Sequence, residues 1–219
     1  MSRLVDTVSQ FRSWAGDHPK DDESWEWDYE FWPTLIKTVL DFFATRPFSS
    51  WSPEEIDSVL YVIAHDPDYM PEITPELPRA YPHLILPLTA AAIERGEAGV
   101  KSRLAFELGA VRFDDPEQER LLFVLLDDDS AGVRDSALRS LALLGHPSVE
   151  KLARESWHHP APGQEWTRIN VLLCLYNTNS PELSAYLDEA QRDGRKWLVI
   201  NADFIRSGKQ GKWVRPIKI

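Results

Sequence analysis

The sequence predicts an all-α protein in which helix pairs stack into an α-solenoid. Apolar residues recur three and four positions apart along almost the whole chain, whereas the period-two alternation of half-buried strands is nearly absent. Helix starts led by a proline recur at Pro116, Pro147 and Pro181, at offsets of 31 and 34 residues. A repeat of that length holds two helices, and a helix pair buries its apolar face only by stacking on its neighbours.

Three helices are expected in the first 64 residues. The first covers residues 3–15, and the second carries the apolar stripe of residues 35–43. The third begins with a capping box, in which Ser52 is the N-cap, Pro53 the first helical residue and Glu55 the reciprocal partner. Residues 65–81 contain four prolines, and because proline fixes φ and lacks an N–H, this segment is expected to be a connector.

From Pro82 onward the pattern predicts four helix pairs. The pairs are 82–95 with 97–111, 116–126 with 130–144, 147–157 with 166–176, and 181–192 with 195–205. The predicted organisation is a helical cap or degenerate repeats over residues 1–80, repeats over 81–207 and a basic C-terminal tail over 208–219. Lys209, Lys212, Arg215 and Lys218 make the tail basic, and it is expected to be a flexible segment or an edge segment. It would contact the acidic front of the chain or bind anionic surfaces, and the sequence does not choose between these alternatives.

The stretch from Leu121 to Gly145 resembles a HEAT repeat, a member of the armadillo-like families. An apolar first helix ends in the acidic turn 127–129, Val133 and Arg134 open a second helix rich in Ala and Leu, and Gly145 ends it. Residues 97–113, which keep Val100 and Lys101, and residues 166–178, which keep Arg168 and the apolar spacing, extend the resemblance to about half of the chain. It implies a right-handed α–α superhelix whose second helices line a concave binding surface.

That resemblance also implies candidate binding residues. They are the second-helix side chains that rotate away from the buried stripe: Arg103, Phe106, Glu107, Ser136, Arg139, Ser140, Asn170, Leu173, Asn177, Trp197 and Asn201. The alternative is that each is an ordinary solvated residue. Lys101, Arg134 and Arg168 are expected to pair with acids in neighbouring turns, which is a structural role.

Residues 17–32, here called the acidic–aromatic segment, interleave carboxylates with large rings. Its central candidates for partner binding are Trp25, Glu26, Trp27, Asp28 and Tyr29. Exposed Trp and Tyr anchor protein interfaces, and carboxylates steer a basic partner towards them. The alternative is that the rings seal an open end of the solenoid while the acids remain solvated, and both can hold at once.

Charge is unevenly distributed along the chain. The formal net charge is −11, with −10 in residues 1–96, −7 in residues 97–194 and +6 in residues 195–219. Duplex-binding proteins offer a broad basic face, so nucleic acid is an unfavoured partner. A single Cys, the lack of an N-terminal basic-then-apolar stretch and the lack of a long apolar run predict a cytoplasmic protein without a membrane partner.

No catalytic residue, metal or cofactor is predicted. His65, Asp66 and Asp68 lie in a proline-rich turn, and His158 and His159 lack the spacing that places two ligands on one helical face. Cys174 lies among leucines, as a buried thiol does.

The predicted function is a non-catalytic protein–protein interaction module, immunity-like or inhibitory, that binds a basic partner such as a toxin domain. Two alternatives stay open. HEAT-like DNA glycosylases of the alkylpurine type use the same scaffold, and an adaptor subunit of a larger complex would use the repeats as spacers. The oligomeric state is not predicted.

Overall fold

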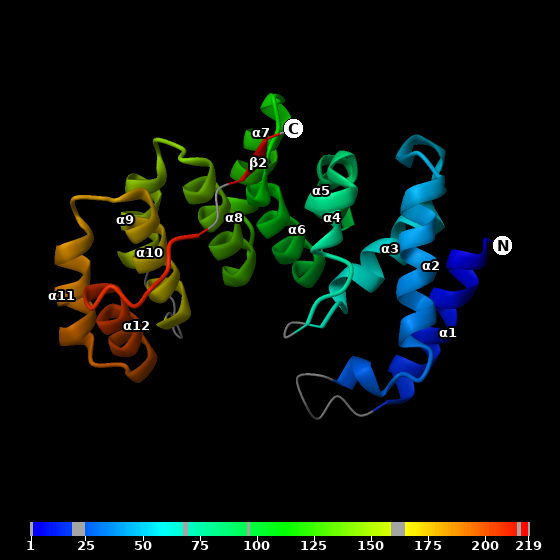
Figure 1. Cartoon of the computed structure of the whole chain (residues 1–219), viewed down its shortest axis with the longest axis horizontal. Helices are drawn as coiled ribbons and strands as arrows, with labels where there is room; N and C mark the ends of the chain where they lie inside the picture. The colour runs from blue at the N-terminus through cyan, green and yellow to red at the C-terminus, as the bar shows by residue number, and fades with distance from the viewer. Residues whose placement is uncertain are drawn as a thin grey trace. The chain divides into compact units, whose positions relative to one another are not determined.

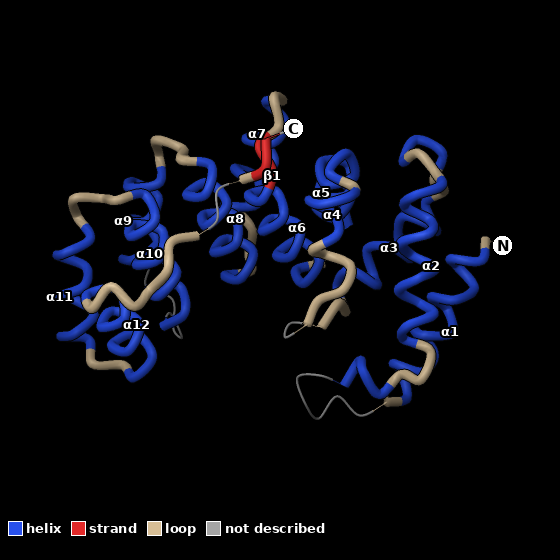
Figure 2. Tube along the Cα trace, in the orientation of Figure 1, coloured by secondary structure: helices blue, strands red, loops and turns tan. Residues whose placement is uncertain are grey.

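The structure, a computed structural model, describes residues 2–18, 25–67, 70–95, 97–158, 165–213 and 216–218. These residues form twelve α-helices, three short 3₁₀ turns and one two-stranded sheet (Figures 1 and 2). The protein is therefore all-α, as its periodicity predicts. The chain divides into two compact units, Met1–Glu107 and Leu108–Ile219.

Unit 1 begins with three helices at the predicted positions. The helices of this unit are α1 (Arg3–Asp17), α2 (Trp32–Thr45), α3 (Pro53–Ala64), α4 (Glu76–Ala80), α5 (Ile85–Arg95) and the start of α6 (Ala98–Ala110), with 3₁₀ turns η1 (Trp25–Asp28), η2 (Phe48–Ser50) and η3 (Pro82–Leu84). Helix α1 packs against α2 and α3, and α3 packs against α5. The predicted connector contains one short helix, α4, between its turns.

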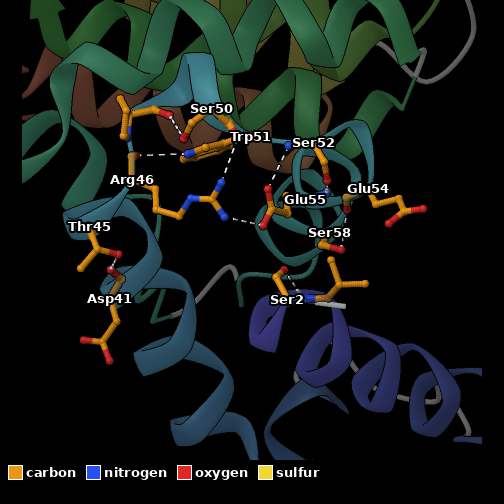
Figure 3. Close-up of polar contacts among 12 residues, drawn as sticks. Ser2, Asp41, Thr45, Arg46, Ser50, Trp51, Ser52, Glu54, Glu55 and Ser58 are labelled. Atoms are coloured by element: carbon orange, nitrogen blue, oxygen red, sulfur yellow. Dashed lines mark hydrogen bonds and ion pairs between the residues drawn. The ribbon is translucent and has the colours of Figure 1, made fainter.

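The link between α2 and α3 is fixed by the predicted capping box and a partly buried ion pair (Figure 3). The Ser52 hydroxyl accepts a hydrogen bond from the Glu55 N–H at 3.2 Å, and the Glu55 carboxylate accepts one from the Ser52 N–H at 2.9 Å. Arg46 Nη1 donates to Glu55 Oε1 at 2.9 Å, and Arg46 Nη2 donates to the Ser50 carbonyl at 2.9 Å. Two N–H groups of the helix start, those of Ser52 and Glu55, thus have side-chain partners.

Unit 2 consists of consecutive helix pairs. Its elements are β1 (Val111–Arg112), α7 (Pro116–Leu126), α8 (Ala131–Leu144), α9 (Val149–His158), α10 (Glu165–Thr178), α11 (Leu183–Asp193), α12 (Lys196–Arg206) and β2 (Ile217–Lys218). Helix α7 packs on α8, α9 on α10 and α11 on α12, while α10 lies against both α8 and α12. The second helices of successive pairs therefore lie side by side (Figure 1).

The core of unit 2 follows the apolar stripes read from the sequence. Val133, Ala137 and Leu141 of α8 are buried, as are Val171 and Leu175 of α10. Gly145 ends α8 in the left-handed conformation with φ of +71°, which explains the glycine at that position. The strand pair was not predicted: β2 runs parallel to β1, with Val111 opposite Ile217 and Arg112 opposite Lys218.

Within the described residues, no helix combines the length and the apolar character that a bilayer crossing requires.

Candidate functional site

The acidic–aromatic segment of unit 1 alternates buried and exposed rings. Trp25 and Tyr29 are 9% and 5% exposed, whereas Trp27 and Phe31 are 43% and 53% exposed. The buried pair packs on Phe11 of α1, with ring centroids at 6.3 Å for Trp25 and 5.1 Å for Tyr29. Burial also raises the pKa of Tyr29 above its usual value. Trp25 and Tyr29 are therefore core anchors, and Trp27 and Phe31 are the rings left for contact.

Carboxylates accompany the two exposed rings. Asp28 and Glu30 are exposed, and Glu26 is half-buried. Asp28 lies 3.3 Å from Nε2 of His18, a partner on the last turn of the α1 region. The predicted members Asp21, Asp22 and Glu23 lie outside the described residues. Because opposite charges attract over a Debye length, these acids favour approach by a basic surface.

Two of the predicted second-helix residues do not lie on an accessible surface. Ser140 is fully buried, because α8 passes so close to Gly109 that a Cβ there would stand 2.6 Å from the Ser140 Cα. Glu107 is 7% exposed, and burial, together with the charge of Asp66, raises its pKa to about 8. Both positions face the interior, and the expectation of solvent contact fails for them. The helical spacing of apolar residues does not show how closely neighbouring helices approach, so it could not predict that these two residues are buried.

The other predicted second-helix residues differ widely in exposure. Trp197 is 47% exposed, while Arg103, Phe106, Ser136, Leu173 and Asn201 are half-buried. Asn170 donates from Nδ2 to the Asp135 carbonyl at 2.9 Å, and Asn201 donates to the Trp197 carbonyl at 2.8 Å. These amides are used within the fold, which leaves Trp197 as an exposed candidate of this group.

Arg139 and Asn177 hold the chain's own C-terminal tail. Asn177 Oδ1 accepts a hydrogen bond from the Trp213 N–H at 2.7 Å. The Arg139 guanidinium lies over the Trp213 ring, 4.6 Å from its centroid, and burial lowers the pKa of Arg139. The structure thus brings two predicted binding residues together on one short segment. From the sequence, Lys212 is expected only to be one of the basic residues of the tail, and Trp213 has no predicted role.

Lys212 is held beside the same helix end. Its ammonium donates to the Tyr176 carbonyl and to Asn179 Oδ1 at 3.0 Å, and it lies 3.8 Å from the centroid of the Tyr176 ring. Desolvation lowers the pKa of Lys212. Tyr176 also donates from its hydroxyl to the Gln210 carbonyl at 2.7 Å. The end of α10 therefore recognises both the main chain and the cation of this segment.

A hollow of about 530 Å³ adjoins these contacts. Its walls are the end of α8 with the turn to α9, the first residues of α9, the end of α10 and the tail residues Lys212 and Trp213. Pro147 and Val149 supply apolar surface, and His146 and Glu150 supply polar groups. The hollow mixes polar and apolar surface, which suits a side chain or a segment of a protein.

The remaining polar and ionisable residues considered above make contacts within the fold or are buried in it. The Asp66 carboxylate accepts hydrogen bonds from the backbone of Glu72, Ile73 and Thr74. Cys174 is fully buried, and burial raises the pKa of its thiol. Arg134 donates to the carbonyls of Asp128 and Asp129 in the acidic turn, and Arg168 pairs with Asp193.

Among the described residues, no group of three or more His, Cys, Asp or Glu side chains is arranged to hold a metal ion. Asp68 and His159, which the sequence analysis considered, lie outside those residues.

Comparisons with protein-family models, with curated proteins and with solved structures give no significant match to this chain.

Proposed function

We propose that this protein is a non-catalytic interaction module that binds a basic partner protein through the acidic–aromatic segment of unit 1. The observation that carries the proposal is the exposure of Trp27 and Phe31, 43% and 53%, on a segment whose other rings are buried. Large exposed rings next to carboxylates give a contact area with an electrostatic preference. Partner binding accounts for two costly exposed rings at one place.

The geometry supports a prepared contact surface. Trp25 and Tyr29 anchor the segment on Phe11 of α1, so Trp27 and Phe31 each follow, by two residues, a ring that is fixed to the core. A preorganised surface loses little conformational entropy on binding. The net charge of −10 over residues 1–96 steers a basic partner to it.

Within this class, the role we propose is inhibitory or immunity-like, in the cytoplasm, on a scaffold of HEAT-like helix pairs that continues as an α-solenoid. The packing of α7 on α8, α9 on α10 and α11 on α12 is consistent with such a scaffold. An inhibitor that blocks a basic enzyme gains from fast, charge-steered association.

The test is a comparison of four immobilised baits against a cytoplasmic extract of the source cell. The baits are the full chain, Trp27→Ala with Phe31→Ala, Asp28→Asn with Glu30→Gln, and Trp166→Ala. Trp166 is the matched control because it is 63% exposed but lies in unit 2. Mass spectrometry identifies the proteins that each bait retains.

We expect one basic protein to be retained at close to one copy per bait by the full chain and by Trp166→Ala. It should be lost with the Trp27 and Phe31 variant, reduced with the charge variant, and released as salt rises to about 1 M because the Debye length shrinks to about 3 Å. Undiminished retention by the Trp27 and Phe31 variant, or retention of acidic proteins only, would contradict the proposal.

A further inference from the structure

The C-terminal tail lies across α10 and α8 and ends in the strand pair β1–β2 (Figure 1). The four side chains that hold its first part, Arg139, Tyr176, Asn177 and Asn179, are here called the tail-binding face. All of them, and the tail itself, belong to unit 2. The face is therefore a complete site within one compact unit.

The contacts of the tail-binding face select for particular main-chain and side-chain groups. Two of them bind the main chain of an extended segment, at the Gln210 carbonyl and at the Trp213 N–H. Two others need particular side chains: the Tyr176 ring and carbonyl take a lysine ammonium, and the Arg139 guanidinium covers an indole. Main-chain bonds provide affinity for any extended peptide, and the side-chain contacts provide selectivity.

Polar contacts and the partial burial of Gln210 and Trp213 hold the tail. Lys209, Gly211 and Lys212 are exposed, and Ile217 of β2 is 48% exposed. The strand pair consists of two residues on each side. Because hydrophobic burial is the main stabilising term and little of it is present here, the tail opens at low cost relative to the helices.

The stretch of chain that carries the face is acidic as a whole, while the face itself consists of one cation, Arg139, and three neutral side chains. Residues 97–194 carry a net charge of −7, whereas the tail places Lys209, Lys212, Arg215 and Lys218 within its last eleven residues. The hollow of about 530 Å³ next to Trp213 leaves space for a segment bulkier than the tail. The face thus fits an incoming extended segment that carries one lysine next to an aromatic residue, as the tail does.

We infer that the tail-binding face is a docking site for an extended segment of a partner protein in which a lysine directly precedes an aromatic residue. In the free protein the C-terminal tail occupies the site, and the partner segment binds by replacing it. The tail competes as an intramolecular ligand at an effective concentration on the order of millimolar. The inference does not depend on the acidic–aromatic segment of unit 1.

The test measures binding of a fluorescein-labelled synthetic peptide with the sequence of residues 208–219 by fluorescence anisotropy. The full-length proteins are the wild type, a tail variant with Lys212→Ala and Trp213→Ala, and that tail variant with Asn177→Ala added. Asn201→Ala in the same tail variant is the matched control, because the Asn201 amide donates within its own helix. A control peptide carries alanine in place of its lysine and tryptophan at positions 212 and 213.

The tail variant should bind the peptide at least tenfold more tightly than the wild type, because its own tail competes less well. Asn177→Ala should remove at least tenfold of that affinity, and Asn201→Ala should leave it unchanged. Equal binding by wild type and tail variant, or equal binding of the two peptides, would overturn the inference.

Two further measurements test whether the peptide displaces the tail and whether the occupant is a second copy of this chain. Saturating peptide should speed hydrogen exchange at the amides of residues 209–213 in the wild-type protein, which requires no substitution, and unchanged exchange would overturn the inference. Light scattering gives the oligomeric state. A dimer that the Lys212 and Trp213 substitutions abolish would assign the face to a second copy of this chain instead of a partner.

Discussion

Gly109 lies against Ser140 so closely that a Cβ on residue 109 would stand 2.5 Å from the Ser140 hydroxyl oxygen and 2.6 Å from its Cα. Real side chains do not approach at such distances, so the last turn of α6 and the middle of α8 pack backbone against backbone. This contact buries Ser140 completely. The contact holds the end of α6, at the start of unit 2, against helix α8 of the first helix pair.

Gly109→Ala should therefore destabilise the protein. Overpacking a close contact costs about 1–3 kcal/mol, which exceeds the gain of about 1 kcal/mol that alanine brings to a helix interior. Urea denaturation would measure the loss as a lower midpoint. Gly99→Ala is the control, because a Cβ at residue 99 would meet Ala64 at an ordinary 3.9 Å. Equal stability of Gly109→Ala and wild type would contradict the close packing.

Glu107 should make the stability of the protein depend on pH. Burial and the charge of Asp66 raise its folded-state pKa from 4.5 to about 8. The folded state then retains a proton that the unfolded state releases, so stability is full below about pH 4.5 and falls as pH rises towards 8. The contribution is about 1.4 kcal/mol for each pH unit in this window.

Glu107→Gln should remove that dependence. Its free energy of unfolding, measured by urea denaturation at pH 5, 6, 7 and 8, should exceed the wild-type value by a margin that grows with pH. A margin that stays constant over this range would show that Glu107 does not titrate with a raised pKa.

The rings of the acidic–aromatic segment should divide into two energetic classes. Trp25→Ala should cost about 3 kcal/mol or more, because it removes a buried ring that packs on Phe11. Trp27→Ala should change stability by less than about 0.5 kcal/mol, because its ring is exposed. Thermal melts of both variants check this. Comparable losses would mean that Trp27 belongs to the core rather than to a contact surface.

The tail should open when its main-chain contact to α10 is removed. Asn177→Ala takes away the acceptor of the Trp213 N–H, and trypsin should then cleave after Lys209 and Lys212 several times faster than in wild type. Mass spectrometry of timed digests gives the rates. Asn201→Ala should digest like wild type, and a similar acceleration in that variant would show a general loosening of the second helices.

The sequence by itself determined the helices of this protein, except for α4 in the predicted connector. The bounds of α7, α8 and α12 differ from prediction by at most one residue, and the Ser52–Glu55 capping box is present as expected. These features are local: proline at a helix start, an oxygen that accepts the first N–H groups, glycine at the end of α8 and apolar residues at helical spacing are all read within a few residues.

The tertiary structure decided which side chains are available. Helical phase placed Ser140 and Glu107 on a surface, yet close packing of neighbouring segments buries both. The sequence did not predict which rings of the acidic–aromatic segment are buried. In the structure, Trp25 and Tyr29 pack on Phe11 and are buried, whereas Trp27 is exposed.

The position of the tail could not be predicted from the sequence either. Trp213 meets Asn177 across 36 residues, and Ile217 pairs with Val111 across more than a hundred. Such pairings depend on where the helix stack places its ends, because a two-residue strand and a single lysine carry no local pattern of their own. Local periodicity fixes the helices, and the contacts between distant segments fix the surfaces.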